Sequence, residues 1–202
     1  MRKTLLTLIA ALAVAGAAAQ NTIGGIQKRY ADIKQTIAQM SEENGYPPEY
    51  YQLNVVQNLP GTGPHREDIR MYYEEEECNE GEVYPPHRIT FATSSYNFAA
   101  RRFYEEYLYD TDGKPAFIYT RTPDLVPDAE SELRLYFSQG RLIWASLKCR
   151  PDERQHAEAA EFQEVSSGAK LPATYSESYD SLLARAEKLR ELFRTVDGAT
   201  YK

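Results

Sequence analysis

Apolar residues recur at two different spacings along this chain, and the spacings divide it into two terminal helices and a central block of strands. Near the N-terminus the apolar residues follow one another at steps of three or four, which places them on one face of a helix. They are Ile26, Tyr30, Ile33, Ile37 and Met40. Asn44-Gly45 directly after them is a typical helix stop.

The same steps return near the C-terminus and predict a second amphipathic helix. Its apolar residues are Leu182, Ala186, Leu189, Phe193 and Val196. Ser178 or Asp180 is expected to cap its start, and Gly198 to end it. The two helices therefore bracket the chain.

Between the helices the apolar period falls to two, and Tyr and β-branched residues dominate, which is typical of half-buried antiparallel strands. The segments with this pattern lie at about 51–55, 69–73, 89–91, 101–110, 116–122, 132–137 and 141–149. Residues 151–165 are expected to form a short acidic helix, followed by a loop to the last helix. The sequence thus predicts an α+β fold, with a meander-like antiparallel sheet of about seven strands packed against the N- and C-terminal helices.

The first 19 residues have the pattern of a secretory signal peptide. Basic Arg2 and Lys3 precede an apolar run that ends in small residues, with Ala17 and Ala19 before the expected cleavage. This run is shorter than the roughly 20 residues that span a bilayer, and no later segment is apolar enough to cross one. We expect a single domain, residues 20–202, in the periplasm or outside the cell, without a transmembrane segment.

The net charge of the chain limits the kinds of partner that it can bind. The chain has 23 basic and 30 acidic residues, and loss of Arg2 and Lys3 leaves 21 basic residues and a net charge of −9. A surface of this sign repels phosphate backbones and anionic lipid headgroups. Nucleic acid is therefore not an expected partner.

The two cysteines, Cys78 and Cys149, are expected to form a disulfide in an oxidising compartment. Their Cα atoms must then lie within about 7 Å of each other. Strict alternation of strand direction would put them at opposite ends of the sheet, so one reversal has to be missing. Residues 89–109 are expected to supply this as one long, bent strand.

The same cysteines with His87 and His156 could instead form a Cys2His2 zinc site, but tight paired spacings such as C-x2-C are absent. A calcium loop starting at Asp110 would put Lys114 and Arg121 at ligand positions, whereas Asp110 and Gly113 suit a type I turn. We expect the turn, and no metal or cofactor.

Catalytic signatures are weak. No G-x-S-x-G nucleophile motif occurs, and the GTG at 61–63 lacks the Lys-Ser/Thr of a phosphate loop. The acidic run Glu74–Glu77 lies at a strand end, where consecutive residues point to opposite faces. No catalytic residue is assigned.

Two aromatic hairpins, EEYLYDTDGKPAFIY and LRLYFSQGRLIWAS, are each closed by Gly and a basic residue. The pair resembles hairpins of uncharacterised bacterial exported proteins, in which aromatic strands flank an Asp-x-x-Gly-Lys turn and a similar hairpin follows. The resemblance covers about residues 104–148. It implies no activity, cofactor or functional residue.

The 16 Tyr and one Trp exceed what a core of this size needs. If both helices pack on the sheet face that carries Leu133, Leu135 and Phe137, the opposite face presents Tyr136 beside Arg134, with Tyr119 and Trp144 as further candidates. Such a face would suit binding to a protein or glycan of the cell envelope or a host.

The sequence therefore favours an exported, non-enzymatic binding or interaction module of unknown ligand. An extracytoplasmic hydrolase and a structural protein associated with the envelope are the alternatives. The oligomeric state is left open.

Overall fold

The computed structural model describes residues 22–43, 45, 48–78, 83–151 and 160–201. The expected signal peptide, residues 1–19, lies outside the described residues.

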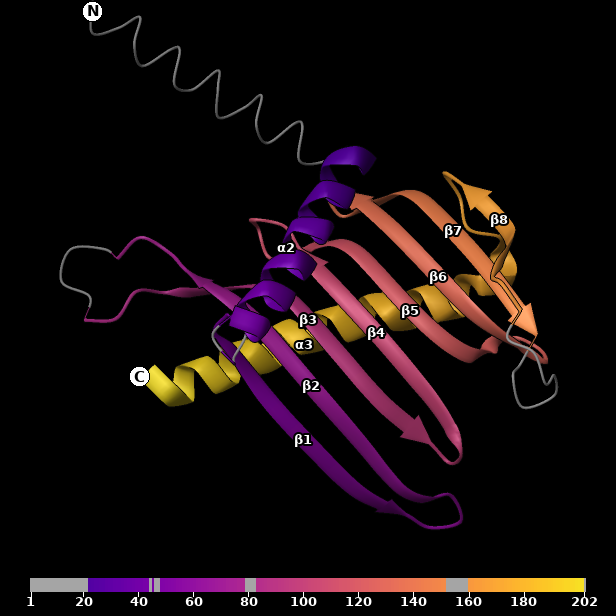
Figure 1. The fold of residues 1–202 in the computed structure, drawn as a ribbon, viewed down its shortest axis with the longest axis horizontal. Coiled ribbons are helices and arrows are strands. Elements are labelled where there is room, and N and C mark those ends of the chain that lie inside the picture. Colours follow the sequence, from indigo (N-terminus) through magenta and orange to yellow (C-terminus); the bar gives the residue numbers. More distant parts are fainter. Residues whose placement is uncertain (1–21, 44, 46–47, 79–82, 152–159, 202) are drawn as a thin grey trace, which may run out of the picture.

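An antiparallel sheet of eight strands forms the centre of the described fold, and its strands follow chain order from one edge to the other (Figure 1). The strands are β1 (Tyr50–Leu59), β2 (Gly63–Glu75), β3 (His87–Phe98), β4 (Arg101–Tyr109), β5 (Pro115–Val126), β6 (Ala129–Ser138), β7 (Arg141–Pro151) and β8 (Gln163–Gly168). Each strand pairs with the next, so the sheet is a meander with β1 and β8 at its edges. The α+β class and the antiparallel sheet are confirmed.

The expected count of about seven strands is too low. β8 forms where the sequence pattern predicts the end of an acidic helix and a loop, and it pairs only with β7. Its sequence, QEVSSG, has a single apolar residue, so the alternation that marks the other strands is missing. Residues 152–159 of the predicted helix lie outside the described residues.

Two long helices cover the sheet, one on each face (Figure 1). They are α2 (Ile23–Glu43) and α3 (Ser176–Tyr201), and the short 3-10 helix η1 (Ala173–Tyr175) leads into α3. α2 ends beside its predicted stop, whereas α3 continues through Gly198. Neither helix in the described part of the chain is long and apolar enough to cross a membrane.

The helices do not share a face, so the arrangement that would leave Tyr136 on an open surface is not found. The central strands explain why, since they are apolar on both sides. Leu108 and Phe117 pack towards α2, while their chain neighbours Tyr107 and Ile118 pack towards α3. Both faces therefore need a cover, and each helix supplies one.

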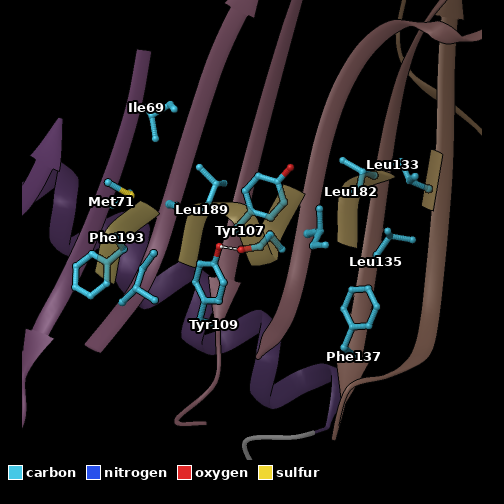
Figure 2. Packing of buried hydrophobic residues seen from close by; sticks show 14 of the residues in the cluster. Ile69, Met71, Tyr107, Tyr109, Leu133, Leu135, Phe137, Leu182, Leu189 and Phe193 are labelled. Carbon is cyan, nitrogen blue, oxygen red and sulfur yellow. Dashed lines mark hydrogen bonds between the residues drawn. The ribbon is translucent and has the colours of Figure 1, made fainter. Parts of the chain in front are cut away.

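α3 lies across the face that carries Met71, Leu133 and Leu135 (Figure 2). Its predicted stripe makes the contact, with Leu182, Ala186, Leu189 and Phe193 buried. Small Ala186 allows close approach, and its carbonyl oxygen accepts a 2.9 Å hydrogen bond from the buried hydroxyl of Tyr109. The apolar spacing in the sequence therefore identifies the buried side of α3 correctly.

α2 covers the opposite face with Ile26, which is fully buried over Phe91, Leu108 and Phe117. Tyr30, next on the same stripe, lies against the rings of Phe91 and Phe117 at centroid distances of 6.1 and 4.8 Å. The rest of the stripe is only half-buried. α2 is thus fastened mainly near its N-terminal half.

The DTDG turn has the predicted form. Gly113 N donates to the carbonyl oxygen of Asp110 at 3.0 Å, and Gly113 has φ of +73°. The Asp110 carboxylate accepts from the backbone N–H groups of Asp112 and Lys114 at 3.0 and 2.8 Å. The Asp110 side chain therefore stabilises the backbone of the turn.

The predicted single strand over residues 89–109 is wrong. β3 and β4 form a tight hairpin in which Phe98 pairs with Arg101, and Ala99 takes φ of +54°. Asn97 holds this turn, because its side-chain amide donates to the carbonyl oxygens of Pro64 and Ala99 at 3.0 and 3.1 Å. The turn contains no Gly or Pro, so its sequence signal is weak.

The predicted disulfide is consequently not formed, and Cys78 and Cys149 are not bonded to each other. With every reversal present, Cys78 follows the end of β2 and Cys149 lies near the opposite end of the sheet on β7. Five strand spacings of about 4.8 Å also separate β2 from β7, or roughly 24 Å. No small movement could bring the two sulfurs together.

Two glycines provide a matched test of the fold. Gly113 has a left-handed backbone, so Gly113→Ala should destabilise the protein by about 1–2 kcal/mol. Gly198 is helical and a Cβ there would meet no atom within 4 Å. Gly198→Ala should therefore stabilise by about 0.5–1 kcal/mol. Urea unfolding of both variants checks this, and shifts in the same direction would contradict it.

Candidate functional site

The candidate site is a cleft between the N-terminal half of α3 and strands β2 to β6, called here the α3 cleft. Two adjoining hollows of about 280 and 340 Å³ make it up, and they share Tyr96, Glu105, Ser181 and Leu182. The other lining residues are His65, Glu67, Phe103, Thr120, Thr122, Leu125, Leu133, Glu177, Ser178 and Arg185. The cleft is thus mixed: His65, Glu67 and Arg185 line one end, and at the other end apolar side chains such as Phe103 and Leu125 lie beside polar ones such as Thr120 and Glu177.

Glu105 on β4 is the most deeply buried carboxylate of the cleft, at 6% exposure. Tyr96 and Tyr107 donate their hydroxyls to its two oxygens at 2.9 and 2.6 Å. Burial raises the pKa of Glu105 above its ordinary value, although the two tyrosine hydrogen bonds act in the opposite direction. A carboxylate has about four acceptor positions, so these two bonds leave Glu105 further capacity.

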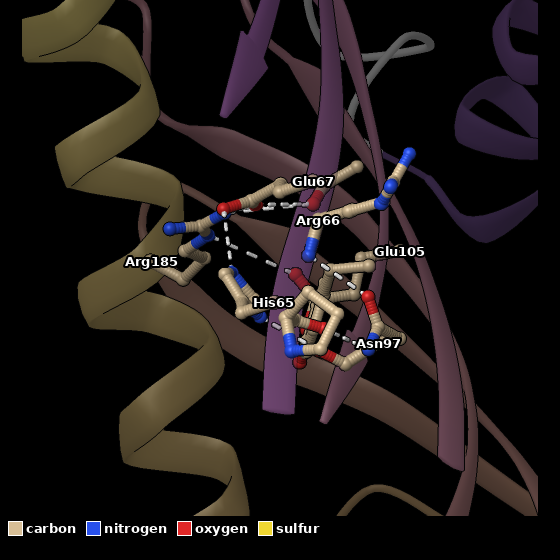
Figure 3. A network of polar contacts seen from close by, with 9 residues as sticks. His65, Arg66, Glu67, Asn97, Glu105 and Arg185 are labelled. Atoms are coloured by element: carbon tan, nitrogen blue, oxygen red, sulfur yellow. Dashed lines mark hydrogen bonds and ion pairs between the residues drawn. The ribbon is translucent and has the colours of Figure 1, made fainter. Parts of the chain in front are cut away.

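Arg185 of α3 reaches across to the sheet (Figure 3). Its Nη2 forms an ion pair with Glu67 on β2, and its Nε lies 3.9 Å from Glu105 Oε2. Burial lowers the pKa of this guanidinium. Arg185 therefore stands between two carboxylates and partly compensates both.

Glu67 is held in place from the sheet side as well. Ser94 Oγ donates to Glu67 Oε1 at 2.7 Å, and His65 Nε2 lies 3.9 Å from Glu67 Oε2. The other ring nitrogen of His65 lies 2.6 Å from the carbonyl oxygen of Asn97, which can only accept, so this Nδ1 carries a proton. Ser94 thus faces a carboxylate, and His65 faces the turn that Asn97 holds.

The contacts among Ser94, Glu67 and Arg185 are better suited to ligand binding than to nucleophilic catalysis. The carboxylate that accepts the hydroxyl of Ser94 is Glu67, which is already held in an ion pair with Arg185 and so is not a free base for a nucleophilic serine. Within the described residues, no group of three or more His, Cys, Asp or Glu side chains could hold a metal ion. The cleft offers fixed hydrogen-bond acceptors beside apolar walls.

A second buried carboxylate, Glu106, lies on the opposite face under α2 and is 1% exposed. Tyr30 and Lys34 of α2 both bind it, and Tyr104 donates to it at 2.6 Å. These three partners occupy the carboxylate of Glu106, and the hollow of about 340 Å³ beside them is lined by Lys34 and Tyr104 but not by Glu106. The Glu106 cluster therefore fastens α2.

The structure places the residues predicted to bind on the α2 face but does not join them into one open surface. Tyr136 is 7% exposed and lies beneath α2, where its hydroxyl accepts from Gln27 at 3.4 Å. Tyr119 donates to Glu132 at 2.8 Å, and the Arg134 guanidinium lies 5.4 Å from the Tyr119 ring. Trp144 is half-buried and packs against the apolar residues beneath α2, which include Tyr136. A binding role for Tyr119, Tyr136, Trp144 and Arg134 stays a prediction.

Sequence reasoning missed the α3 cleft because its charged residues are far apart in the chain, with Arg185 118 positions after Glu67. One signal was present. In YEEYLY, two consecutive glutamates interrupt a strand whose alternating aromatic and apolar residues predict burial on both faces. Charged residues in such a strand need partners from whatever covers each face.

The raised pKa of Glu105 predicts a pH dependence of stability. The folded protein holds a proton on Glu105 at pH values where the unfolded chain, with an ordinary Glu pKa, has lost it. The contribution of Glu105 to stability is therefore complete below the ordinary Glu pKa and is lost as pH rises through the raised folded-state pKa.

Glu105→Gln cannot ionise and lacks this contribution. The free energy of unfolding of the unmodified protein, minus that of the variant, should fall as pH rises from about 4 and then level off. Urea unfolding of both proteins over this pH range gives the difference. A value independent of pH would contradict the assignment.

Comparison with protein-family models, with curated proteins and with solved structures gives no match to this chain.

Proposed function

We propose that the protein is an exported, non-enzymatic binding module that holds a small, donor-rich ligand in the α3 cleft. The observation that carries this proposal is the hollow itself, in which buried Glu105 and half-buried Arg185 line a cavity that also has apolar walls. Buried groups of this kind cost free energy, and they concentrate at binding and catalytic sites.

The size of the cleft limits the ligand. Its two hollows, about 280 and 340 Å³, are at the lower end of small-molecule pockets. A ligand of one or two sugar rings has the matching size. A folded partner protein could reach the cleft only with a single protruding side chain or loop.

The charges of the cleft favour a ligand that donates hydrogen bonds. Glu67, Glu105 and Glu177 supply three carboxyl groups, whereas Arg185 is the only arginine or lysine among the lining residues and is already paired. Carboxylates accept and do not donate, so they suit hydroxyl and amino groups. Phe103 and Tyr96, stacked at a centroid distance of 4.9 Å, add an aromatic surface for the apolar side of a sugar ring.

A glycan of the cell envelope or of a host is therefore the partner class that we favour. The expected signal peptide supports this setting, because an exported protein meets such glycans. The net negative charge disfavours anionic ligands in general.

A hydrolase is the second candidate, and it would use the same cleft. Glycoside hydrolases pair a carboxyl group of raised pKa with an ionised carboxylate, and Glu105 and Glu67 could take these parts. Against this reading, Glu67 is already engaged by Ser94 and Arg185 and is not free to attack a sugar or activate water. Binding is the better-supported function.

The test uses a panel of neutral monosaccharides, disaccharides and amino sugars, with binding measured by ligand-observed NMR and then by calorimetry. We expect at least one sugar to bind the unmodified protein. Ser181→Trp should weaken this binding at least tenfold, because Ser181 lines both hollows and an indole would fill them.

Ala184→Trp is the matched control, since Ala184 is exposed on α3 and does not line the cleft. Binding should survive this substitution. Equal loss in both variants, or binding that neither variant affects, would overturn the assignment of the cleft. Release of a smaller sugar by the unmodified protein, abolished in Glu105→Gln, would support the hydrolase instead.

A further inference from the structure

The edge strand β1 differs from the other seven strands of the described sheet in carrying no charged residue. Its sequence is YYQLNVVQNL, whereas each of β2 to β8 contains at least one Asp, Glu, Lys or Arg. Its outer side has no neighbouring strand in the described fold. Edge strands of monomeric proteins are usually protected by charges, prolines or bulges, and β1 has none of these along its ten residues.

The half of β1 farther from the helices is the more open. Asn54–Asn58 are all exposed, and Val55 and Val56 are 40% and 70% exposed. Figure 1 shows this end of β1 and β2 extending beyond both α2 and α3. By contrast, the start of β1 is held by α3, since Tyr51 donates to Asp197 at 2.9 Å. A partner strand therefore has access to about residues 53–59.

We propose that this segment is an interface between two copies of the chain, which pair antiparallel through β1 about a two-fold axis at Val56. Residues opposite each other in an antiparallel pair point to the same face, so only registers that match odd with odd and even with even positions are allowed. The register centred on Val56 pairs Val56 with itself, Asn54 with Asn58 and Leu53 with Leu59. Val55 lies opposite Gln57 in this register, and like residues meet at all other positions of the contact.

The chemistry of β1 fits a second copy of this chain. Each copy has a net charge of −7, or −9 without the expected signal peptide, so association between copies is opposed by repulsion over most of the surface. β1 is the strand at which two copies can approach without placing like charges opposite each other. The Asn54–Asn58 amides can both donate and accept across the contact, and the backbone groups of both edges become paired.

The contact between the two β1 strands is short, and this limits the affinity of the dimer. Seven residues span about 23 Å of sheet edge. Such an edge contact is smaller than the interfaces of stable dimers, so we expect a dimer with a dissociation constant in the micromolar range. The two sheets would join into one, with both α3 helices on the same face.

The test is analytical ultracentrifugation of the purified chain across a concentration series, with three variants. Val56→Lys places two positive charges at the two-fold axis and should raise the dissociation constant at least tenfold. Val165→Lys is the control, because Val165 is 56% exposed on the other edge strand, β8, and should leave the dimer unchanged.

A mixture separates this register from any other contact. Val56→Lys and Val56→Glu should each be monomeric alone, and they should form a mixed dimer when combined, since the opposite charges then face each other across the axis. A monomeric unmodified protein at all concentrations overturns the proposal. So does a dimer that Val56→Lys leaves intact, or a mixture that stays monomeric.

Discussion

Two adjacent glutamates on the central strand β4 set the constraint on which the fold and the site depend. Glu105 and Glu106 point to opposite faces of a sheet that is buried on both sides, and both are nearly inaccessible. Buried carboxylates are costly unless they are paired or hydrogen-bonded. Each face therefore needs a helix that brings a cation, and these are Lys34 of α2 and Arg185 of α3.

The two faces meet this need differently, and the difference produces the site. Around Glu106, Tyr30, Lys34 and Tyr104 close directly on the carboxylate. Around Glu105, the cation is shared with Glu67 and stands 3.9 Å away, so α3 does not seal against the sheet at this point. The cleft is the space that remains. A ligand with hydroxyl or amino groups can occupy it and complete the hydrogen bonding of Glu105.

The sequence predicted local structure well and long-range structure poorly. The period of 3.6 identified the stripe of Leu182, Ala186 and Leu189, and the chemistry of Asp110 and Gly113 identified their turn, because both are set by neighbouring residues. The side of the sheet that each helix covers was missed, since it depends on two-sided burial of strands far away in the chain. The Asn97-held hairpin was missed because it contains no Gly or Pro, and because the expected disulfide required one reversal of the chain to be absent. Arg185 could not be matched with Glu67 and Glu105 before the meander had placed them together.

Hydrogen exchange resolved to individual segments tests most directly whether each helix is fastened by its own cation. Lys34→Met and Arg185→Met each leave a buried carboxylate without its cation, and because Lys34 is 43% and Arg185 31% exposed, the cost should be below the roughly 3–5 kcal/mol of a fully buried pair. Exchange should rise at least tenfold in α2 for Lys34→Met and in the first half of α3 for Arg185→Met, with the other helix unchanged in each case. Equal acceleration of both helices in either variant, or protection that neither variant alters, would contradict the account.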